Sequence, residues 1–178
     1  MKKFHEMTIH EQAIHINQIL RFESDGVFWI KSFPGRVKVG DQAGYVITIR
    51  NRRHYVIKIN RRVYFIHRLR WLAENGEWPK GQIDHKDRNT LNNKMDNIRE
   101  ATQSQQNANR RPFRDRKFKG VYDNGNKWRA RIGLKGKVIN LGSFSSETEA
   151  AKRYDEEAIK YFGEFALTNK SLGLLPPC

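Results

Sequence analysis

The chain has 178 residues with 34 Lys and Arg against 19 Asp and Glu, a net charge of +15 and a sequence pI near 10.1. This charge favours a nucleic-acid partner over an anionic membrane face or a merely solvated basic surface. A hydrophobic fraction of 38% favours small modules over one large core, and no run is apolar enough to predict a membrane span or signal peptide. The single cysteine, Cys178, excludes an internal disulfide and a zinc ribbon.

Residues 1–66 are predicted to form a basic helix and a β-meander. Apolar residues recur at helical spacing in Ile9, Ala13, Ile16 and Leu20. Runs of β-branched and aromatic residues predict strands at Val27–Ile30, Tyr45–Arg50, His54–Ile59 and Val63–Ile66. Five turn arginines either grip backbone phosphates or keep the sheet edge soluble, namely Arg50, Arg52, Arg53, Arg61 and Arg62.

Residues 67–109 hold the candidate chemistry. A helix is predicted at His67–Asn75, with Gly76 as its stop. The polar run I-D-H-K-D-R-N-T-L-N-N-K-M-D-N-I-R-E-A-T-Q-S-Q-Q-N then extends from Ile83 to Asn107. Within it, Asp84 offers a carboxylate for a hard metal ion and His85 an imidazole that takes a proton near neutral pH. The segment is nearly neutral among basic flanks, as a metal-assisted phosphate site requires.

The run H-R-L-x-W-L-x-x-x-G-x-W-P-x-G-x-I-D-H-x-D-x-N-x-x-N-N-x-x-x-N-I-R-E-A-T-x-x-Q-x-N, from His67 to Asn107, resembles the HNH homing endonucleases of phages and mobile introns. The resemblance implies a ββα-metal finger made of strands 82–85 and 97–102 and a helix at 103–110. It implies that His85 is the general base and that Asn97 holds the far side of its imidazole. Asp84 and Asn107 would bind one Mg²⁺ or Mn²⁺ ion, and His67 is interpreted as structural.

Residues 110–117 are predicted to be a basic linker, either a solvated connector or a strap along a nucleic-acid backbone. Residues 118–170 predict a three-stranded antiparallel sheet packed on one helix, followed by a tail at 171–178. The strands are expected at Gly120–Tyr122, Lys127–Leu134 and Lys137–Phe144, and the helix begins at a Ser146–Glu149 capping box and ends near Gly163. Side chains alternate between the two faces of a strand, so Trp128, Ala130 and Ile132 are predicted to face the helix. Arg129 and Arg131 are then predicted to face a partner.

The stretch F-K-G-V-Y-x-x-x-x-K-W-R-A-R-I…V-I-N-L-G-S-F resembles the Apetala-two/ethylene-response-factor (ERF) DNA-binding domain, with the resemblance covering Phe118 to Asn169. It implies that the sheet faces DNA. Tyr122, Val138 and Asn140 replace residues with which the plant domains read bases, so the plant target does not carry over. We expect DNA contacts from Lys119, Arg129, Arg131, Lys135, Lys137 and Asn140, and from the linker residues Arg110, Arg111 and Arg114.

The sequence therefore predicts an α+β protein of several modules that acts as a metal-dependent endonuclease on double-stranded DNA. We expect a monomer or a DNA-dependent dimer without membrane contact, cytoplasmic in a bacterial host if a phage or intron encodes it. The alternative is a non-catalytic, sequence-specific DNA-binding regulator with a silent finger. A third possibility, an RNA-binding protein, predicts exposed stacking aromatics, against which the expected burial of Trp128 counts.

Overall fold

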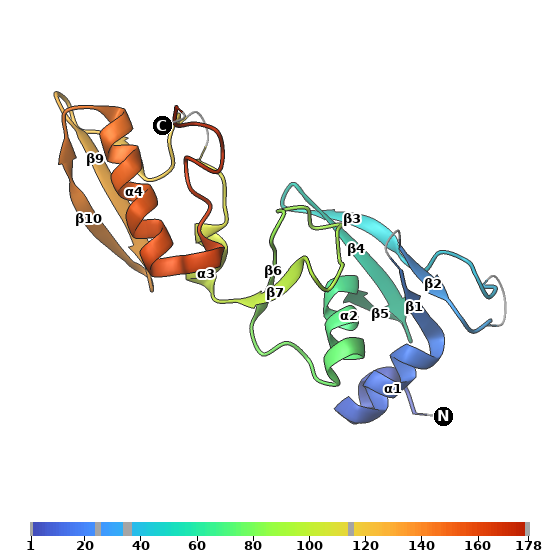
Figure 1. The fold of residues 1–178 in the computed structure, drawn as a ribbon. Coiled ribbons are helices and arrows are strands. Elements are labelled where there is room, and N and C mark those ends of the chain that lie inside the picture. Colours follow the sequence, from blue (N-terminus) through green and yellow to red (C-terminus); the bar gives the residue numbers. More distant parts are fainter. Residues whose placement is uncertain (1, 24–25, 34–36, 114–115, 177–178) are drawn as a thin grey trace. The chain divides into compact units, whose positions relative to one another are not determined.

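The computed structural model describes residues 2–23, 26–33, 37–113 and 116–176. The chain forms two compact units, residues 1–100 and 101–178 (Figure 1). This division falls earlier than the boundary expected after residue 109, so the helix of the predicted finger belongs to the second unit. Within the described ranges, no helix is long and apolar enough to cross a membrane. Both units mix helices with small sheets, as the predicted α+β class requires.

The first unit consists of short helices and five small strands, followed by a two-stranded sheet at its end. Its helices are η1 (Phe4–Glu6), α1 (Ile9–Ile19) and α2 (Ile66–Asn75). Its strands are β1 (Leu20–Phe22), β2 (Val27–Trp29), β3 (Tyr45–Ile49), β4 (Arg52–Ile59), β5 (Arg62–Phe65), β6 (Gln82–His85) and β7 (Ile98–Ala101), of which β7 crosses into the second unit.

The predicted amphipathic helix is confirmed as α1. Thr8 begins it with a capping box, because its Oγ1 accepts from the Glu11 N–H while the Glu11 carboxylate accepts from the Thr8 N–H. The buried side chains of α1 join a core to which α2 and β4 also contribute, in which Ile16, Ile57 and Leu69 are almost fully buried. Gly76 ends α2 in a left-handed conformation, with φ of 72°, as predicted.

The predicted meander is confirmed as the antiparallel sheet β3-β4-β5. Its two tight turns place Arg50, Asn51, Asn60 and Arg61 at positive φ. The five turn arginines named above are all exposed. The strand expected at Val27–Ile30 is β2, and it pairs with β1, which we did not predict.

The second unit contains one sheet covered by a long helix. Its elements are α3 (Gln103–Ala108), β8 (Val121–Asp123), β9 (Trp128–Leu134), β10 (Lys137–Phe144), α4 (Glu147–Phe162) and η2 (Gly163–Phe165). The strands are antiparallel in the order β10-β9-β8, and α4 packs across all three. The predicted three-stranded sheet with one covering helix is therefore confirmed.

Packing against α4 follows the alternation predicted for β9. Ala130 and Ile132 are buried in the interior of the second unit, at 0% and 2% exposure. Gly120 has a φ of 74°, and a Cβ there would lie 1.9 Å from the Tyr154 ring, so only glycine lets the chain pass this close to α4. Ser146 caps α4 as expected, but the predicted capping box is only half formed, because the Glu149 carboxylate accepts from the Ser145 hydroxyl instead.

Candidate functional site

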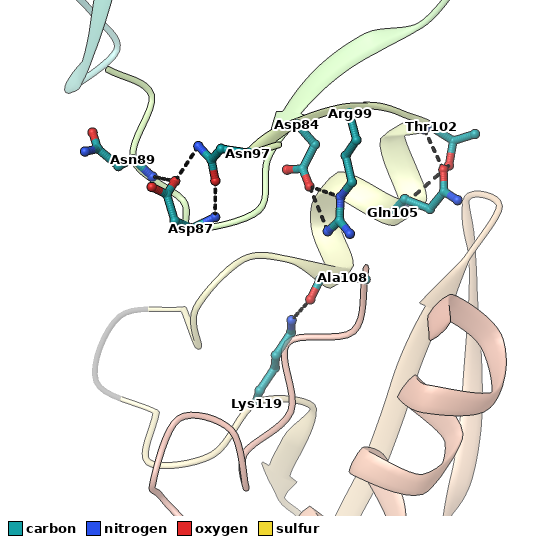
Figure 2. Close-up of polar contacts among 9 residues, drawn as sticks. All are labelled: Asp84, Asp87, Asn89, Asn97, Arg99, Thr102, Gln105, Ala108 and Lys119. Atoms are coloured by element: carbon teal, nitrogen blue, oxygen red, sulfur yellow. Dashed lines mark hydrogen bonds and ion pairs between the residues drawn. The ribbon is translucent and has the colours of Figure 1, made fainter. Parts of the chain in front are cut away.

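Strand β6 ends in Asp84 and His85, and both side chains are buried, at 9% and 5% exposure. β6 pairs with β7 in a two-stranded sheet, and α3 follows after Thr102. The three elements therefore occur in the predicted order of strand, strand and helix, within the bounds expected for each. Figure 2 shows the polar contacts made from these elements.

The loop between β6 and β7 is organised around Asp87, a residue that we did not single out. Asp87 Oδ1 accepts from the Asn89 N–H at 2.8 Å and from Asn97 Nδ2 at 3.0 Å, as Figure 2 shows, and its Oδ2 accepts from Asn92 Nδ2 at 2.7 Å. Burial opposes ionisation of Asp87, but these hydrogen bonds favour its carboxylate and lower its pKa. The Asn-rich run is thus a loop held in shape by the hydrogen bonds of Asp87. The spacing D-x-N-x-x-N-N is the sequence signal that identifies this arrangement.

The amide that holds the His85 imidazole belongs to Asn93. His85 Nε2 lies 3.0 Å from Asn93 Oδ1, and Asn93 Nδ2 donates to the Leu91 carbonyl at 3.2 Å. Because Asn93 turns its oxygen to the ring, Nε2 carries the proton and donates it. The basic lone pair of the neutral ring is then on Nδ1.

The prediction that Asn97 bonds the imidazole is wrong. Asn97 Oδ1 accepts from the Asp87 N–H at 3.0 Å, and its Nδ2 donates to Asp87 Oδ1 and to the Asn92 carbonyl at 2.7 Å. These contacts tie the end of the loop to its beginning. Asn97 therefore fixes the loop from which Asn93 reaches the His85 ring, and its own effect on His85 is indirect.

His67, from α2, packs against His85. Their ring centroids lie 5.4 Å apart with the planes at 85°, an edge-to-face arrangement. Burial first, and then the nearby His85 and His54, lowers the pKa of His67 to about 3. A neutral ring thus lies against the candidate base at neutral pH.

Asp84, the predicted metal ligand, forms a buried ion pair with Arg99 of β7. Arg99 Nε donates to Asp84 Oδ2 at 3.1 Å, and the terminal nitrogen of its guanidinium lies 3.1 Å from the same oxygen (Figure 2). Both side chains are about nine-tenths buried. The β6–β7 sheet therefore already places a positive charge at this carboxylate, and sequence reasoning missed Arg99.

Asn107, the second predicted ligand, lies exposed on α3 in the second unit, where its Oδ1 accepts from Gln103 Nε2 at 3.2 Å. Carboxylate and amide oxygens completed by water suit Mg²⁺ or Mn²⁺ better than zinc, so the two predicted ligands fit such an ion by donor chemistry. Across the described ranges, no group of three or more His, Cys, Asp or Glu side chains could hold a metal ion.

Most of the predicted DNA-binding residues of the second unit have accessible side chains. Arg129 and Arg131 are half-buried on β9, and the Arg131 guanidinium lies 5.3 Å from the Tyr122 ring centroid. Arg116, which we did not predict, lies 4.3 Å from the same ring. The remaining described residues of the predicted set are exposed, namely Arg110, Arg111, Lys135, Lys137 and Asn140. Arg114 lies outside the described residues.

The structure corrects the prediction that Lys119 contacts DNA. Its side chain is buried, and its ammonium donates to the Ala108 carbonyl (Figure 2) and to the Leu167 carbonyl at 3.3 Å. The strand alternation used to assign exposed residues does not extend to Lys119, because β8 begins only at Val121. Lys119 therefore holds the interior of the unit together.

Comparison with known proteins gives a family for the segment that contains the β6–β7 loop. Residues 64–108 match the HNH endonuclease family. An uncharacterised HNH endonuclease of Acanthamoeba polyphaga mimivirus is 35% identical over 89 residues, which cover 49% of this chain and 46% of the viral protein. No solved structure matches the chain at a significant level.

Shorter similarities extend to plant proteins. APETALA2-like protein 2 of Oryza sativa subsp. indica is 46% identical over 56 residues, 30% of this chain and 13% of the plant protein. An ethylene-responsive transcription factor-like protein of Arabidopsis thaliana is 50% identical over 41 residues, 23% of this chain and 18% of that protein. The chain thus spans less than half the length of these curated relatives. Residues 64–108 are thus similar to the HNH endonuclease family, and the chain is similar to a viral HNH endonuclease over about half of its length.

Proposed function

We propose that this protein is a metal-dependent endonuclease that hydrolyses phosphodiester bonds in duplex DNA. The observation that carries the proposal is the arrangement at the end of β6, where Asp84 and a His85 imidazole oriented by Asn93 lie in the segment that matches the HNH family. A buried, oriented imidazole next to a carboxylate is what a general base beside a metal ligand needs.

In this mechanism His85 takes a proton from the attacking water. The bond to Asn93 keeps the His85 proton on Nε2, so Nδ1 is the accepting atom and Asn93 stabilises the imidazolium that forms. Asn97 and Asp87 hold the loop that carries Asn93. Mg²⁺ or Mn²⁺ held by Asp84 would neutralise charge on the phosphate and the leaving oxygen.

The basic residues of the second unit are proposed to bind the DNA. Arg129 and Arg131 lie on the strand face opposite to Ala130 and Ile132, with Lys135 and Lys137 at the following turn. Cations aligned on one face of a sheet suit the phosphates on either side of a groove. The short plant similarities support the same assignment, and Arg110 and Arg111 extend it along the chain.

One observation favours the rival function, a DNA-binding regulator with a silent finger. The Arg99 guanidinium already forms an ion pair with the Asp84 carboxylate. A finger that binds no metal ion needs such a positive charge to balance the buried carboxylate. The two functions differ in what happens to bound DNA: the rival binds without any metal-dependent cleavage.

A nicking assay decides between them. The full chain is incubated with supercoiled plasmid and with genomic DNA from its source, in Mg²⁺ or in EDTA. The nuclease proposal expects nicked DNA only with Mg²⁺, and an Asp84→Asn variant, which keeps an oxygen for the Arg99 guanidinium, that binds DNA with wild-type affinity without nicking it. Binding with no nicking of any substrate by the wild-type chain supports the regulator instead.

A further inference from the structure

Exposed arginines occupy both ends of strand β4 in the first unit. Three lie at its beginning and two at the turn that follows its end, namely Arg50, Arg52 and Arg53, and then Arg61 and Arg62. Within the ranges that the structure describes, none of the five forms an ion pair with a carboxylate, whereas the exposed Arg21 pairs with Glu23. Their guanidinium groups are therefore available to an anion from outside the chain.

A continuous row of rings connects the candidate base with the beginning of β4. His67 lies edge-to-face against His85, with 5.4 Å between the ring centroids, and Phe65 stacks on His67 at a centroid distance of 5.4 Å. The ring of His54 packs against Phe65, again at 5.4 Å. Because His54 is the third residue of β4, the beginning of this strand lies near His85.

Arg52 lies on the same side of β4 as His54. The two residues are separated by one position along the strand, so their side chains project from the same face of the sheet. Burial first, and then the nearby His85 and Arg52, lowers the pKa of His54. His85 and Arg52 therefore both lie close enough to the His54 ring to act on its charge.

The loop that orients His85 is attached to the beginning of β4. The hydroxyl of Thr90 donates to the carbonyl of Arg53, the residue next to Arg52. The same loop carries Asn93, which bonds the His85 ring. It also carries three exposed cations, namely Lys86, Arg88 and Lys94. Cations from the loop and from β4 therefore border the candidate base.

We propose that Arg52 binds the backbone of the substrate DNA, at a phosphate adjacent to the bond whose hydrolysis His85 assists. This inference rests on the proposed function, because it takes duplex DNA as the substrate and His85 as the base. An arginine suits the role, because its planar guanidinium donates two parallel hydrogen bonds to phosphate oxygens. This contact needs no residue of the second unit, so the first unit holds the DNA that it cleaves with a residue of its own.

The test measures duplex affinity of the full-length chain in EDTA over a series of salt concentrations. Arg52→Gln should reduce the slope of log affinity against log salt by about one. The loss should be the same on unrelated duplexes, because a phosphate contact carries no sequence information. Arg52→Lys should keep the wild-type slope, because it keeps the charge, and the melting temperature should not change in either variant, since Arg52 is exposed.

The matched control is Arg62→Gln, the same change at an exposed position of the same sheet. Arg62 pairs with Ile59 at the other end of β4, roughly 23 Å from Arg52 along the strand. It should leave the slope unchanged. A wild-type slope in Arg52→Gln, or equal reductions in Arg52→Gln and Arg62→Gln, would overturn the proposal.

The position of the contact is tested on a duplex whose cleavage site has been mapped. Phosphates on either side of the cleaved bond are replaced one at a time by uncharged methylphosphonates, and affinity is measured in EDTA. At one of them the replacement should weaken binding by the wild type and by Arg52→Lys, but not by Arg52→Gln, which has already lost the contact. Equal losses in wild type and Arg52→Gln at every flanking phosphate would refute the placement of Arg52.

Cleavage by the wild type separates this inference from the proposed function. If the wild type cleaves DNA and Arg52→Gln keeps the wild-type slope, the nuclease proposal stands and only the role of Arg52 is refuted. If Arg52→Gln lowers the slope but the wild type cleaves no DNA with Mg²⁺, the proposed function is wrong. The inference then fails with it, because there is no cleaved bond beside which Arg52 could bind.

Discussion

The Nε2 atom of His85 lies 3.0 Å from the Oδ1 atom of Asn93, which comes from the loop between β6 and β7. This contact selects the ring tautomer with the proton on Nε2 and fixes the plane of the imidazole. In the proposed mechanism it makes Asn93, and not Asn97, the residue that aims the general base.

Replacing Asn93 with Ala should slow cleavage about 10- to 100-fold, the usual cost of losing a group that orients a catalytic side chain. Duplex affinity should not change, because the Asn93 side chain is buried and bonds the His85 ring. The control is Asn89→Ala in the same loop, whose amide oxygen accepts from the Leu91 N–H at 3.1 Å and does not touch the ring. Equal single-turnover rates for the two variants would refute the role of Asn93.

Replacing Arg99 with Met should lower the free energy of unfolding by about 3–5 kcal/mol, because it leaves the buried Asp84 carboxylate without its guanidinium. Mn²⁺ should then raise the melting temperature of the variant more than that of the wild type, since an ion bound at Asp84 replaces the missing positive charge. Arg21→Met, which removes an exposed ion pair with Glu23, is the control and should cost at most about 1 kcal/mol. Equal Mn²⁺ effects on Arg99→Met and wild type would argue against metal binding by Asp84.

His67 should make stability depend on acidity. In the unfolded chain its pKa is near 6.5, whereas in the fold it is about 3. Between these values the unfolded chain binds a proton that the fold does not, so stability is complete above the unfolded pKa and falls as the pH is lowered. The loss is at most about 1.4 kcal/mol per pH unit.

Urea unfolding of the wild type and His67→Phe at pH 7.5, 6, 5 and 4.5 measures this contribution. Other titrating groups are shared by the two chains, so their difference isolates His67. The wild type should lose more stability than the variant as the pH falls. A difference that does not vary with pH would contradict the lowered pKa.

The salt dependence of duplex binding tests the sheet of the second unit. Arg129→Ala with Arg131→Ala should reduce the slope of log affinity against log salt by about two, one for each phosphate that an arginine no longer neutralises. The control is Lys152→Ala with Lys160→Ala, two exposed cations on α4, the opposite side of the sheet. An equal reduction in both double variants would remove β9 from the interface.

Much of the fold follows from periodicity in the sequence. The meander β3-β4-β5 and the sheet β8-β9-β10 are recognisable because their apolar residues alternate between well-marked turns. The short strand β1 escaped prediction, because Leu20 continues the helical spacing of α1 and only its pairing with β2 makes it a strand.

The contacts of the site were harder to predict. Asn89, Asn92, Asn93 and Asn97 have the same donors and acceptors, so spacing alone does not say which one reaches His85. The choice depends on the turns that Asp87 stabilises. Lys119 was misassigned for a related reason: a lysine in a basic segment is normally exposed, and only the packing of α3 provides the carbonyls that make its burial possible.

The central claim is that His85 is the base of a metal-dependent nuclease, and single-turnover cleavage of a mapped site tests it most directly. Wild type and His85→Ala are compared at saturating protein in Mg²⁺, with duplex affinity measured in EDTA. We predict that His85→Ala binds as tightly as wild type and cleaves about 10²- to 10⁴-fold more slowly, the range for loss of a general base. Cleavage by His85→Ala at the wild-type rate, or none by the wild type on any DNA from its source, would contradict the account.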